Sequence, residues 1–439
     1  MKKNNLFTAI CLATCLLSCS SNSDEYINSI PSYNRDVTNI NMQTDEEIIE
    51  GDASHQFLAS LLYTKLITTI GKPSKDIPMA VSYPDYFGGA FTDEGGNLTI
   101  LIKGELKYGE EQVISIIGRS SILRFVECSY SYQELTDIMK KISNNFQSFP
   151  RKVQKEMCFY YIEDKENKVI IGLTNLQSET KGIIKKLTND NKAIDYIECQ
   201  KKVRVKNLTP KSLVIPVFLG CGSIVQCYRN NDSIYGSWAF RARDINDTTI
   251  IGMITAGHVM AVNSDSAFVG NHFVGLTPVA YDTPEIDAAF VETYTENIHN
   301  PINPTNILAV ANINGLYPNY SNYTGELSTD MNAPCYDLIV NKRGWTTGLT
   351  TGKIKSTDFC EVVEDQNGLI VNIQHMILAS FSCDEGDSGG VVYTYFSAQN
   401  KRYTTGILKG YVYYDTWGIY ASVFTSAITA LSMLHLERY

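Results

Sequence analysis

Ser388 lies between glycines in the stretch CDEGDSGGVV (383 to 392), and this setting is typical of a nucleophilic serine. A serine hydroxyl is a weak nucleophile until a neighbouring base takes its proton, so it needs a histidine and a carboxylate from elsewhere in the chain. Gly-Asp-Ser-Gly-Gly by itself is also an ordinary turn between two strands. The chemical interpretation therefore depends on whether the partners exist.

Two residues earlier in the chain are suitable partners. His258 follows an apolar strand-like run in IIGMITAGHVM, and Asp287 lies inside the apolar alternating run PEIDAAFVE. A carboxylate is costly to bury unless it is hydrogen-bonded, and the Nδ1 proton of a histidine is a suitable donor. Each residue alone is a weak signal, since a histidine at a strand end is more often structural. The order His258, Asp287, Ser388 is that of chymotrypsin-type β-barrel proteases and differs from the orders of subtilisins and α/β-hydrolases.

Three stretches resemble bacterial chymotrypsin-fold serine proteases such as the streptogrisins and α-lytic protease. They are Thr-Ala-Gly-His at 255–258, Gly-Asp-Ser-Gly-Gly at 386–390 and VNKRGWTTGLTTGKI at 340–354. The resemblance covers about residues 213–439, and the upstream region resembles the propeptides of the same family more loosely. It implies that His258 is the general base and that Asp287 orients it. The backbone N–H groups of Gly386 and Ser388 are then expected to form the oxyanion hole.

The resemblance also implies how the nucleophile loop is braced. Asp387 matches a buried aspartate that orders this loop and meets a basic side chain, for which Lys342 and Arg343 are both placed. The alternative is an exposed charge pair in a turn, of little energetic value. The family usually has a cysteine after the catalytic histidine, whereas this chain has Val259, so the disulfide that braces that loop is missing or replaced.

The walls of the substrate pocket depart from the family. Ser382 stands six residues before the nucleophile, where a protease that cuts after Lys or Arg typically has an aspartate. Lys409, Gly410 and Tyr411 stand where relatives have Ser-Gly-Gly beside the substrate. Either the alignment slips by one residue, or a lysine lies near the active site and favours an acidic substrate residue. We expect small or apolar residues to be preferred first and acidic residues second.

The chain divides into four segments. Residues 1–19 form an export signal whose end, Leu-Leu-Ser-Cys, resembles the lipobox of bacterial lipoproteins, so Cys19 is the expected lipidation site. The alternative is an ordinary cleaved signal peptide with an incidental cysteine. Residues 20–53 are polar and form a flexible linker. Residues 54–210 form an α+β propeptide-like domain, and 211–439 form the protease-like domain.

Periodicity predicts the architecture of the two domains. Similar hairpins at 87–102 and 159–173, each backed by helices, predict two related α+β halves, with a chance likeness of two common hairpins as the alternative. One helix carries apolar residues on one face from Tyr132 to Phe146. Beyond residue 211, short strand-like runs separated by turns predict an all-β, chymotrypsin-like double β-barrel, with a closing helix after Ser422.

Composition limits the classes of partner. The 439 residues are 44% hydrophobic with a net charge of −10, which indicates a globular protein with no basic run for nucleic acid. No CxxC or His-rich spacing indicates a metal site, and we expect no cofactor. The pairing of the cysteines outside the signal cannot be read from the sequence.

The sequence leaves two hypotheses for function. The first is a serine endopeptidase of the cell envelope, on the outer membrane or cell surface, which acts on proteins or peptides and touches the membrane through its N-terminal lipid only. The second is a catalytically silent trypsin-like barrel that binds a partner at the cell surface.

Overall fold

The computed structural model describes residues 53–73, 81–177, 179–200, 219–229, 232–260, 265–269, 272–294, 304–308, 325–364, 368–413 and 420–439. The predicted signal peptide with Cys19, the linker up to residue 52 and the domain boundary at 210–211 lie outside these residues. No helix in the described part is long and apolar enough to cross a membrane.

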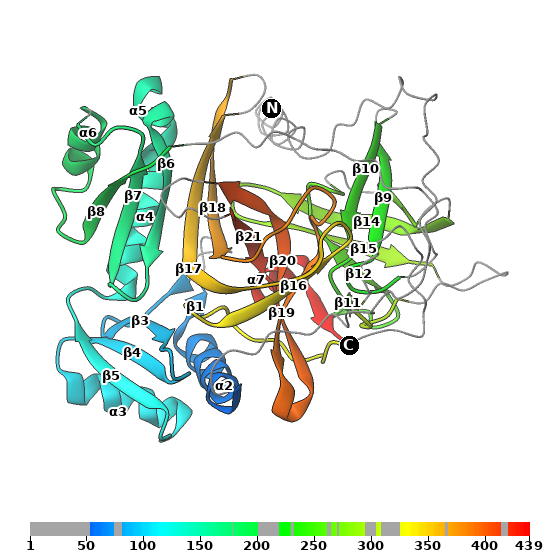
Figure 1. The fold of residues 1–439 in the computed structure, drawn as a ribbon, viewed down its shortest axis with the longest axis horizontal. Helices are drawn as coiled ribbons and strands as arrows, with labels where there is room; N and C mark the ends of the chain where they lie inside the picture. Colours follow the sequence, from blue (N-terminus) through cyan, green and yellow to red (C-terminus); the bar gives the residue numbers. More distant parts are fainter. Residues whose placement is uncertain are drawn as a thin grey trace, which may run out of the picture.

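The upstream region contains two units with the same order of elements: a hairpin, a helix and a strand parallel to the second hairpin strand (Figure 1). The first comprises β3 (Phe87–Thr92), β4 (Leu98–Lys103), α3 (Leu106–Ile117) and β5 (Leu123–Cys128). The second comprises β6 (Met157–Glu163), β7 (Lys168–Leu173), α6 (Glu179–Leu187) and β8 (Ile194–Glu198). The predicted repeat of two α+β halves is therefore confirmed in the topology.

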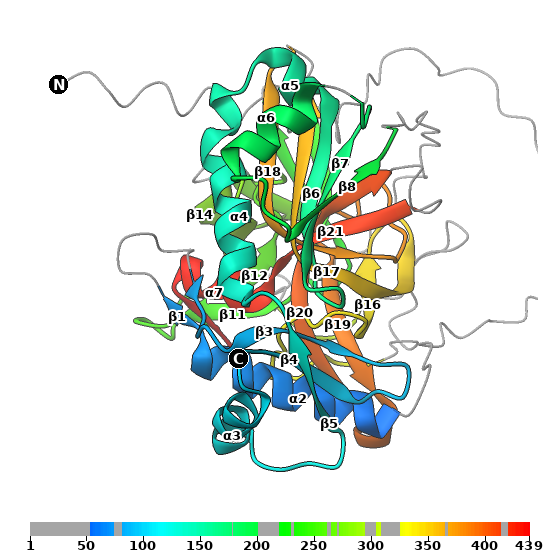
Figure 2. The same cartoon turned by 90° about the vertical axis from the view of Figure 1, so that its left-hand side faces the viewer.

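Helices and short strands complete this region. They are α2 (Ala53–Ile70), β1 (Lys72–Pro73), β2 (Val81–Ser82), α4 (Tyr132–Asn145), the 3-10 turn η1 (Phe146–Ser148) and α5 (Arg151–Glu156). Helix α4 starts with a capping box, in which the Ser131 side chain accepts from the Glu134 backbone and the Glu134 side chain accepts from the Ser131 backbone. Its predicted apolar face is buried against β6 and β7 (Figure 2).

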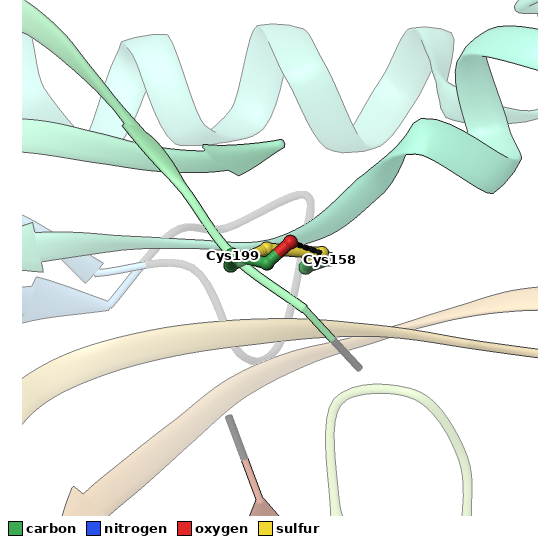
Figure 3. The surroundings of a disulfide bond; sticks show 2 residues. All are labelled: Cys158 and Cys199. Atoms are coloured by element: carbon green, nitrogen blue, oxygen red, sulfur yellow. Dashed lines mark hydrogen bonds between the residues drawn. A yellow bond between two sulfur atoms is a disulfide. The ribbon is translucent and has the colours of Figure 1, made fainter. Parts of the chain in front are cut away.

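A disulfide joins Cys158 of β6 to Cys199, which directly follows β8 (Figure 3). Strand β7 lies between these two strands in the sheet. The disulfide therefore fixes the end of β8 across the full width of the second α+β unit.

The first β unit downstream is an eight-stranded antiparallel sheet in the order β10, β9, β13, β14, β15, β12, β11, β22. Its strands are β9 (Ile224–Arg229), β10 (Asp232–Ser237), β11 (Arg241–Asp244), β12 (Ile251–Thr255), β13 (Ser266–Val269), β14 (His272–Asp282), β15 (Asp287–Thr293) and the C-terminal β22 (Leu436–Arg438). Because β22 comes from the chain end and pairs with β11, it fastens the second β unit to the first.

The second β unit is a closed six-stranded antiparallel barrel in the order β16, β19, β20, β21, β18, β17, closed by pairing of β16 with β17. Its elements are β16 (Ile339–Gly344), β17 (Gly348–Glu364), β18 (Ile370–Ala379), β19 (Val391–Phe396), the 3-10 turn η3 (Ser397–Gln399), β20 (Lys401–Tyr413), β21 (Tyr420–Ser426) and α7 (Ala427–Leu434). With the α+β region before it, this is the chymotrypsin-like architecture predicted from the sequence.

The closing helix starts later than predicted. Helix α7 begins at Ala427, and Ser422 lies within β21, where its hydroxyl donates to the Phe381 carbonyl at 2.7 Å. Val423 and Phe424 pair with β18 in the barrel, so their burial comes from the sheet and not from the helix.

Strand β6 of the upstream region pairs with β17 of the barrel, so the two regions share one nine-stranded sheet. The two strands run side by side in Figure 1. The backbone N–H of Thr92 also donates to the Tyr336 carbonyl at 2.9 Å, and the Asn332 amide donates to the Ser60 hydroxyl at 2.8 Å. The upstream region is thus bound to the barrel through β6, β3 and α2.

Candidate active site

The ends of two paired strands bring His258 and Asp287 together. Strand β12 ends at Thr255, which pairs with Ala289 of β15, and Asp287 is the first residue of β15. Gly257 allows this approach, since a Cβ there would lie 1.8 Å from the Tyr281 carbonyl oxygen. The Asp287 carboxylate accepts the backbone N–H of His258 at 2.8 Å through Oδ1, and Oδ2 lies 2.7 Å from Nδ1 of the same histidine.

The environment of Asp287 keeps its carboxylate ionised. The side chain is fully buried, and burial alone would raise its pKa. Attraction to His258 and to the Lys409 ammonium, together with the hydrogen bonds from His258, outweighs burial and holds the pKa of Asp287 well below its usual range. An ionised carboxylate on Nδ1 leaves Nε2 of the ring as the nitrogen that can take a proton.

The Ser388 hydroxyl lies in the same site but donates to the Lys409 carbonyl at 3.1 Å. Nε2 of His258 is buried and has no hydrogen-bond partner among the described residues. Two of the three predicted residues are therefore hydrogen-bonded to each other. The hydroxyl of the third must rotate from the Lys409 carbonyl to reach a base, which is common in sites without substrate.

The nucleophile loop leaves two backbone amides available. Gly386 has a φ of 87°, and a Cβ there would lie 2.5 Å from the Thr346 hydroxyl, so glycine is required. The Glu385 carbonyl accepts from the Thr346 hydroxyl, and the Gly386 carbonyl accepts from the Ser237 hydroxyl at 2.7 Å. Within the described residues, the N–H groups of Gly386 and Ser388 donate no hydrogen bond that would occupy them. These are the amides predicted to form the oxyanion hole.

A buried ion pair braces this loop from behind. Asp387 lies 3.0 Å from the Lys342 ammonium, and neither side chain is exposed. The carboxylate also accepts the backbone N–H groups of Thr346 and Thr347 at 2.8 and 3.0 Å. Of the two cations for which the sequence left the choice open, Lys342 forms this pair, and it does so from β16.

Lys409 on β20 lies against the triad carboxylate. Its ammonium is 3.1 Å from Oδ2 of Asp287 and 3.7 Å from Oδ1 of Asp282. Of the two alternatives left by the sequence, the structure shows the one in which a lysine lies near the active site, with its ammonium against two carboxylates of the protein. The preference for an acidic substrate residue stays a prediction. Asp282 was not predicted as a neighbour of Lys409. The signal for it was its place just before the turn that leads to Asp287.

The other predicted pocket residues are placed as follows. Ser382 is exposed, and its carbonyl accepts the Thr350 hydroxyl at 2.6 Å. A Cβ on Gly410 would meet no atom within 4 Å, so open space lies beside this strand position. Tyr411 is partly buried and packs against the core of the barrel. The roles of Ser382, Gly410 and Tyr411 in substrate specificity stay predictions.

The loop after the histidine is held by hydrogen bonds to its backbone. The Val259 carbonyl accepts from the Cys227 thiol at 3.1 Å and from the Arg229 guanidinium at 3.4 Å. Arg229 also forms an ion pair with Asp265 at 2.9 Å. Sequence reasoning missed this arrangement, because it depends on a neighbouring strand, β9, and not on a motif.

Comparison with known proteins gives one family match and several similar solved structures. Residues 48–128 match the family model of a Pro-like N-terminal domain. Similar solved structures include Thermobifida fusca protease A (18% identity, TM-score 0.37, covering 50% of this chain and 97% of that chain) and Nocardiopsis protease (19%, 0.38, 50% and 98%). Another is Cellulomonas bogoriensis chymotrypsin (21%, 0.35, 50% and 98%). No curated protein matches. Residues 48–128 are thus similar to a Pro-like N-terminal domain, and the β region that follows the upstream region has the strand topology described above.

Metal chemistry has no candidate site in the described ranges. No three His, Cys, Asp or Glu side chains in them are grouped so that they could hold a metal ion.

Proposed function

We propose that this chain is an exported serine endopeptidase that hydrolyses peptide bonds of proteins or peptides through Ser388, His258 and Asp287. The observation that carries the proposal is the buried pair of His258 and Asp287, in which one carboxylate binds both the backbone and the ring of the histidine. This arrangement fixes the orientation and tautomer of the imidazole, which a general base requires.

In the proposed mechanism the Ser388 hydroxyl rotates to Nε2 of His258, which takes its proton as Oγ attacks the carbonyl carbon of the substrate. The N–H groups of Gly386 and Ser388 stabilise the oxyanion, each by about 3 kcal/mol. His258 then gives the proton to the leaving amine, and an acyl-enzyme ester remains on Ser388. Water attacks this ester with His258 again as base, which releases the carboxylic acid and restores the serine.

The proposal includes the location and maturation of the enzyme. Cys19 is lipidated, so the protein is anchored in the cell envelope, on the outer membrane or cell surface. The upstream region is an inhibitory chaperone that self-cleavage removes, and the alternative is a permanent accessory domain. In support, β6 is hydrogen-bonded to β17 of the barrel, so the upstream region extends the sheet of the barrel itself.

A second function has one observation in its favour. Because the Ser388 hydroxyl donates to a backbone carbonyl and not to His258, a catalytically silent barrel that binds a partner is the alternative. Labelling with a fluorophosphonate probe separates the two. We expect the wild type to be labelled, Ser388→Ala to remain unlabelled, and His258→Ala to react at least a hundredfold more slowly. A folded wild type that the probe does not label even after the upstream region has been removed would overturn the enzyme and favour the silent barrel.

A further inference from the structure

A lysine and a second aspartate accompany the triad carboxylate. Asp282 and Asp287 are directly opposite each other in the pairing of β14 with β15. The Lys409 ammonium, from β20, lies within 4 Å of both, at 3.7 and 3.1 Å. The exposed fractions of these side chains are 6% for Asp282, 0% for Asp287 and 14% for Lys409, so solvent screens their interactions poorly.

The positive charge of Lys409 compensates one of the two negative charges of Asp282 and Asp287. Two ionised carboxylates opposite each other repel, and a cation that contacts both removes that repulsion. With Lys409 present, the three side chains together place one net negative charge beside His258. A single aspartate with an uncharged neighbour would give the same value. Without Lys409 the histidine would face two negative charges, and without Asp282 it would face none.

Two further ion pairs lie in the loops that follow His258 and carry Ser388. Arg229 and Asp265 form an ion pair beside the Val259 carbonyl, and Lys342 pairs with Asp387 behind Ser388. Glu285 lies in the turn between β14 and β15, two residues before Asp287. Burial lowers the pKa of His375, but its ion pair with Asp358 at 3.2 Å and a smaller effect of Glu285 outweigh burial and raise that pKa. The residues of β21 that contact Asp287 are uncharged, as Thr425 illustrates.

We propose that Lys409 and Asp282 form a compensating charge pair that sets the pH range in which His258 acts as general base. Lys409 is a positioning residue, since its ammonium acts on the histidine through Asp287. Asp282 is its necessary counterpart, because a lysine alone would cancel the charge of Asp287 and weaken the stabilisation of the imidazolium that forms during the reaction. This inference rests on the proposed function.

The test is the dependence of kcat/KM on pH for the full chain and four variants. Lys409→Met removes the cation at similar length, and we expect the acidic limb of the profile to move up by about one pH unit. Asp282→Asn should move that limb down by a similar amount and lower the plateau roughly tenfold. The double variant Lys409→Met with Asp282→Asn restores one net negative charge, so its limb should return to within a few tenths of a unit of wild type. Lys409→Arg should keep the wild-type profile.

If the two residues act through their charges, the acidic limb moves in opposite directions in the two single variants, and the two shifts cancel in the double variant. Unchanged limbs in both single variants, or losses that add in the double variant without any shift, would overturn the proposal and leave a packing role.

The inference can be tested even if the proposed function fails. If the fluorophosphonate probe does not label the wild type, the same four variants are compared by NMR titration of the His258 imidazole. The same opposite shifts are then expected in the resonance, and equal midpoints in all variants would reject the charge pair.

Discussion

Asp287 accepts hydrogen bonds from the backbone and the ring of one histidine and from the Lys409 ammonium, all within a fully buried site. Asparagine keeps the size of the side chain but presents an N–H where the ring needs an acceptor. We therefore expect Asp287→Asn to keep the fold and to lower kcat by about four orders of magnitude. Circular dichroism checks the fold and peptide hydrolysis gives kcat. Near-normal turnover would mean that Asp282 takes over the role.

The sequence predicted some residues of the candidate site and missed the contacts of others. His258 and Asp287 stand in short motifs whose chemistry depends on residue type and order, and the structure brings these two residues into hydrogen-bond contact. The role of Ser388 as nucleophile stays a prediction. The contact of Lys409 with Asp282 and Asp287 could not be predicted in detail, because it joins β20 to the hairpin of β14 and β15, more than 100 positions earlier in the chain. A lysine has a flexible stem, and its position on a strand leaves the direction of the ammonium open.

Strand β16 and the nucleophile loop are connected by the buried pair of Lys342 and Asp387. Removal of one partner leaves a buried charge without compensation, and this is far more costly than removal of both. We expect Lys342→Met to lower the free energy of unfolding by about 3–5 kcal/mol, and Lys342→Met with Asp387→Asn to lose clearly less. Urea denaturation measures both values. A double variant at least as unstable as the single one would show that the pair itself stabilises the loop.

The contact between the upstream region and the barrel includes a buried carboxylate. Asp164, which directly follows β6, accepts the hydroxyl and the backbone N–H of Thr357 on β17 at 2.7 and 3.2 Å. Burial raises the pKa of Asp164 to about 7, although these hydrogen bonds oppose the shift. The carboxyl group is thus easier to ionise in the unfolded chain than in the folded one.

The raised pKa of Asp164 gives a pH dependence with a definite sign. Its contribution to stability is complete below the ordinary pKa near 4 and is lost as pH rises through about 7. Between pH 4 and pH 7 we expect the free energy of unfolding to fall in the wild type and to fall less in Asp164→Asn. The two decreases should differ by at least about 1 kcal/mol. Part of the slope remains in the variant, since burial also raises the pKa of Glu163. Equal slopes in urea titrations at pH 4 to 8 would contradict the expectation.

At the level of elements, local sequence patterns predicted individual helices and hairpins but not the pairing of strands that are distant in the chain. Alternation and turn residues predicted both hairpins of the upstream region, and helical spacing predicted the buried face of α4. The start of α7 was misplaced because the apolar residues of β21 continue the helical spacing of the residues that follow. The pairing of β6 with β17 joins residues about 200 positions apart, which no local pattern specifies.

At the scale of the whole molecule, the upstream region and the six-stranded barrel share both a β-sheet and an apolar core. A single apolar core contains Ala59 of α2, Ile138 of α4, Tyr160 of β6 and, from the barrel, Ile354 and Phe424. A shared core and a shared sheet mean that each region buries apolar surface of the other. We expect the two regions to remain associated after a cut between them, unless denaturant or a protease removes one.

The last prediction concerns such a cut. Residues 206–213, KNLTPKSL, form a polar, proline-containing junction between the two regions, of a kind where proteolytic nicking concentrates. The disulfide between Cys158 and Cys199 lies wholly upstream of this junction, so it does not link the two products. If the upstream region is removed by self-cleavage, a wild-type chain tagged after Tyr439 should yield a fragment of about 25 kDa, estimated from its share of the sequence.

The control is Ser388→Ala carrying the same tag, which should stay at full length when masses are compared over time. Non-reducing gels should release the fragment as readily as reducing gels, because the disulfide does not span the junction. Fragments in both chains would point to a host protease acting on an exposed segment. A full-length wild type that hydrolyses peptides would show instead that the upstream region is a permanent accessory domain, and in that case the shared sheet and core hold an active enzyme together.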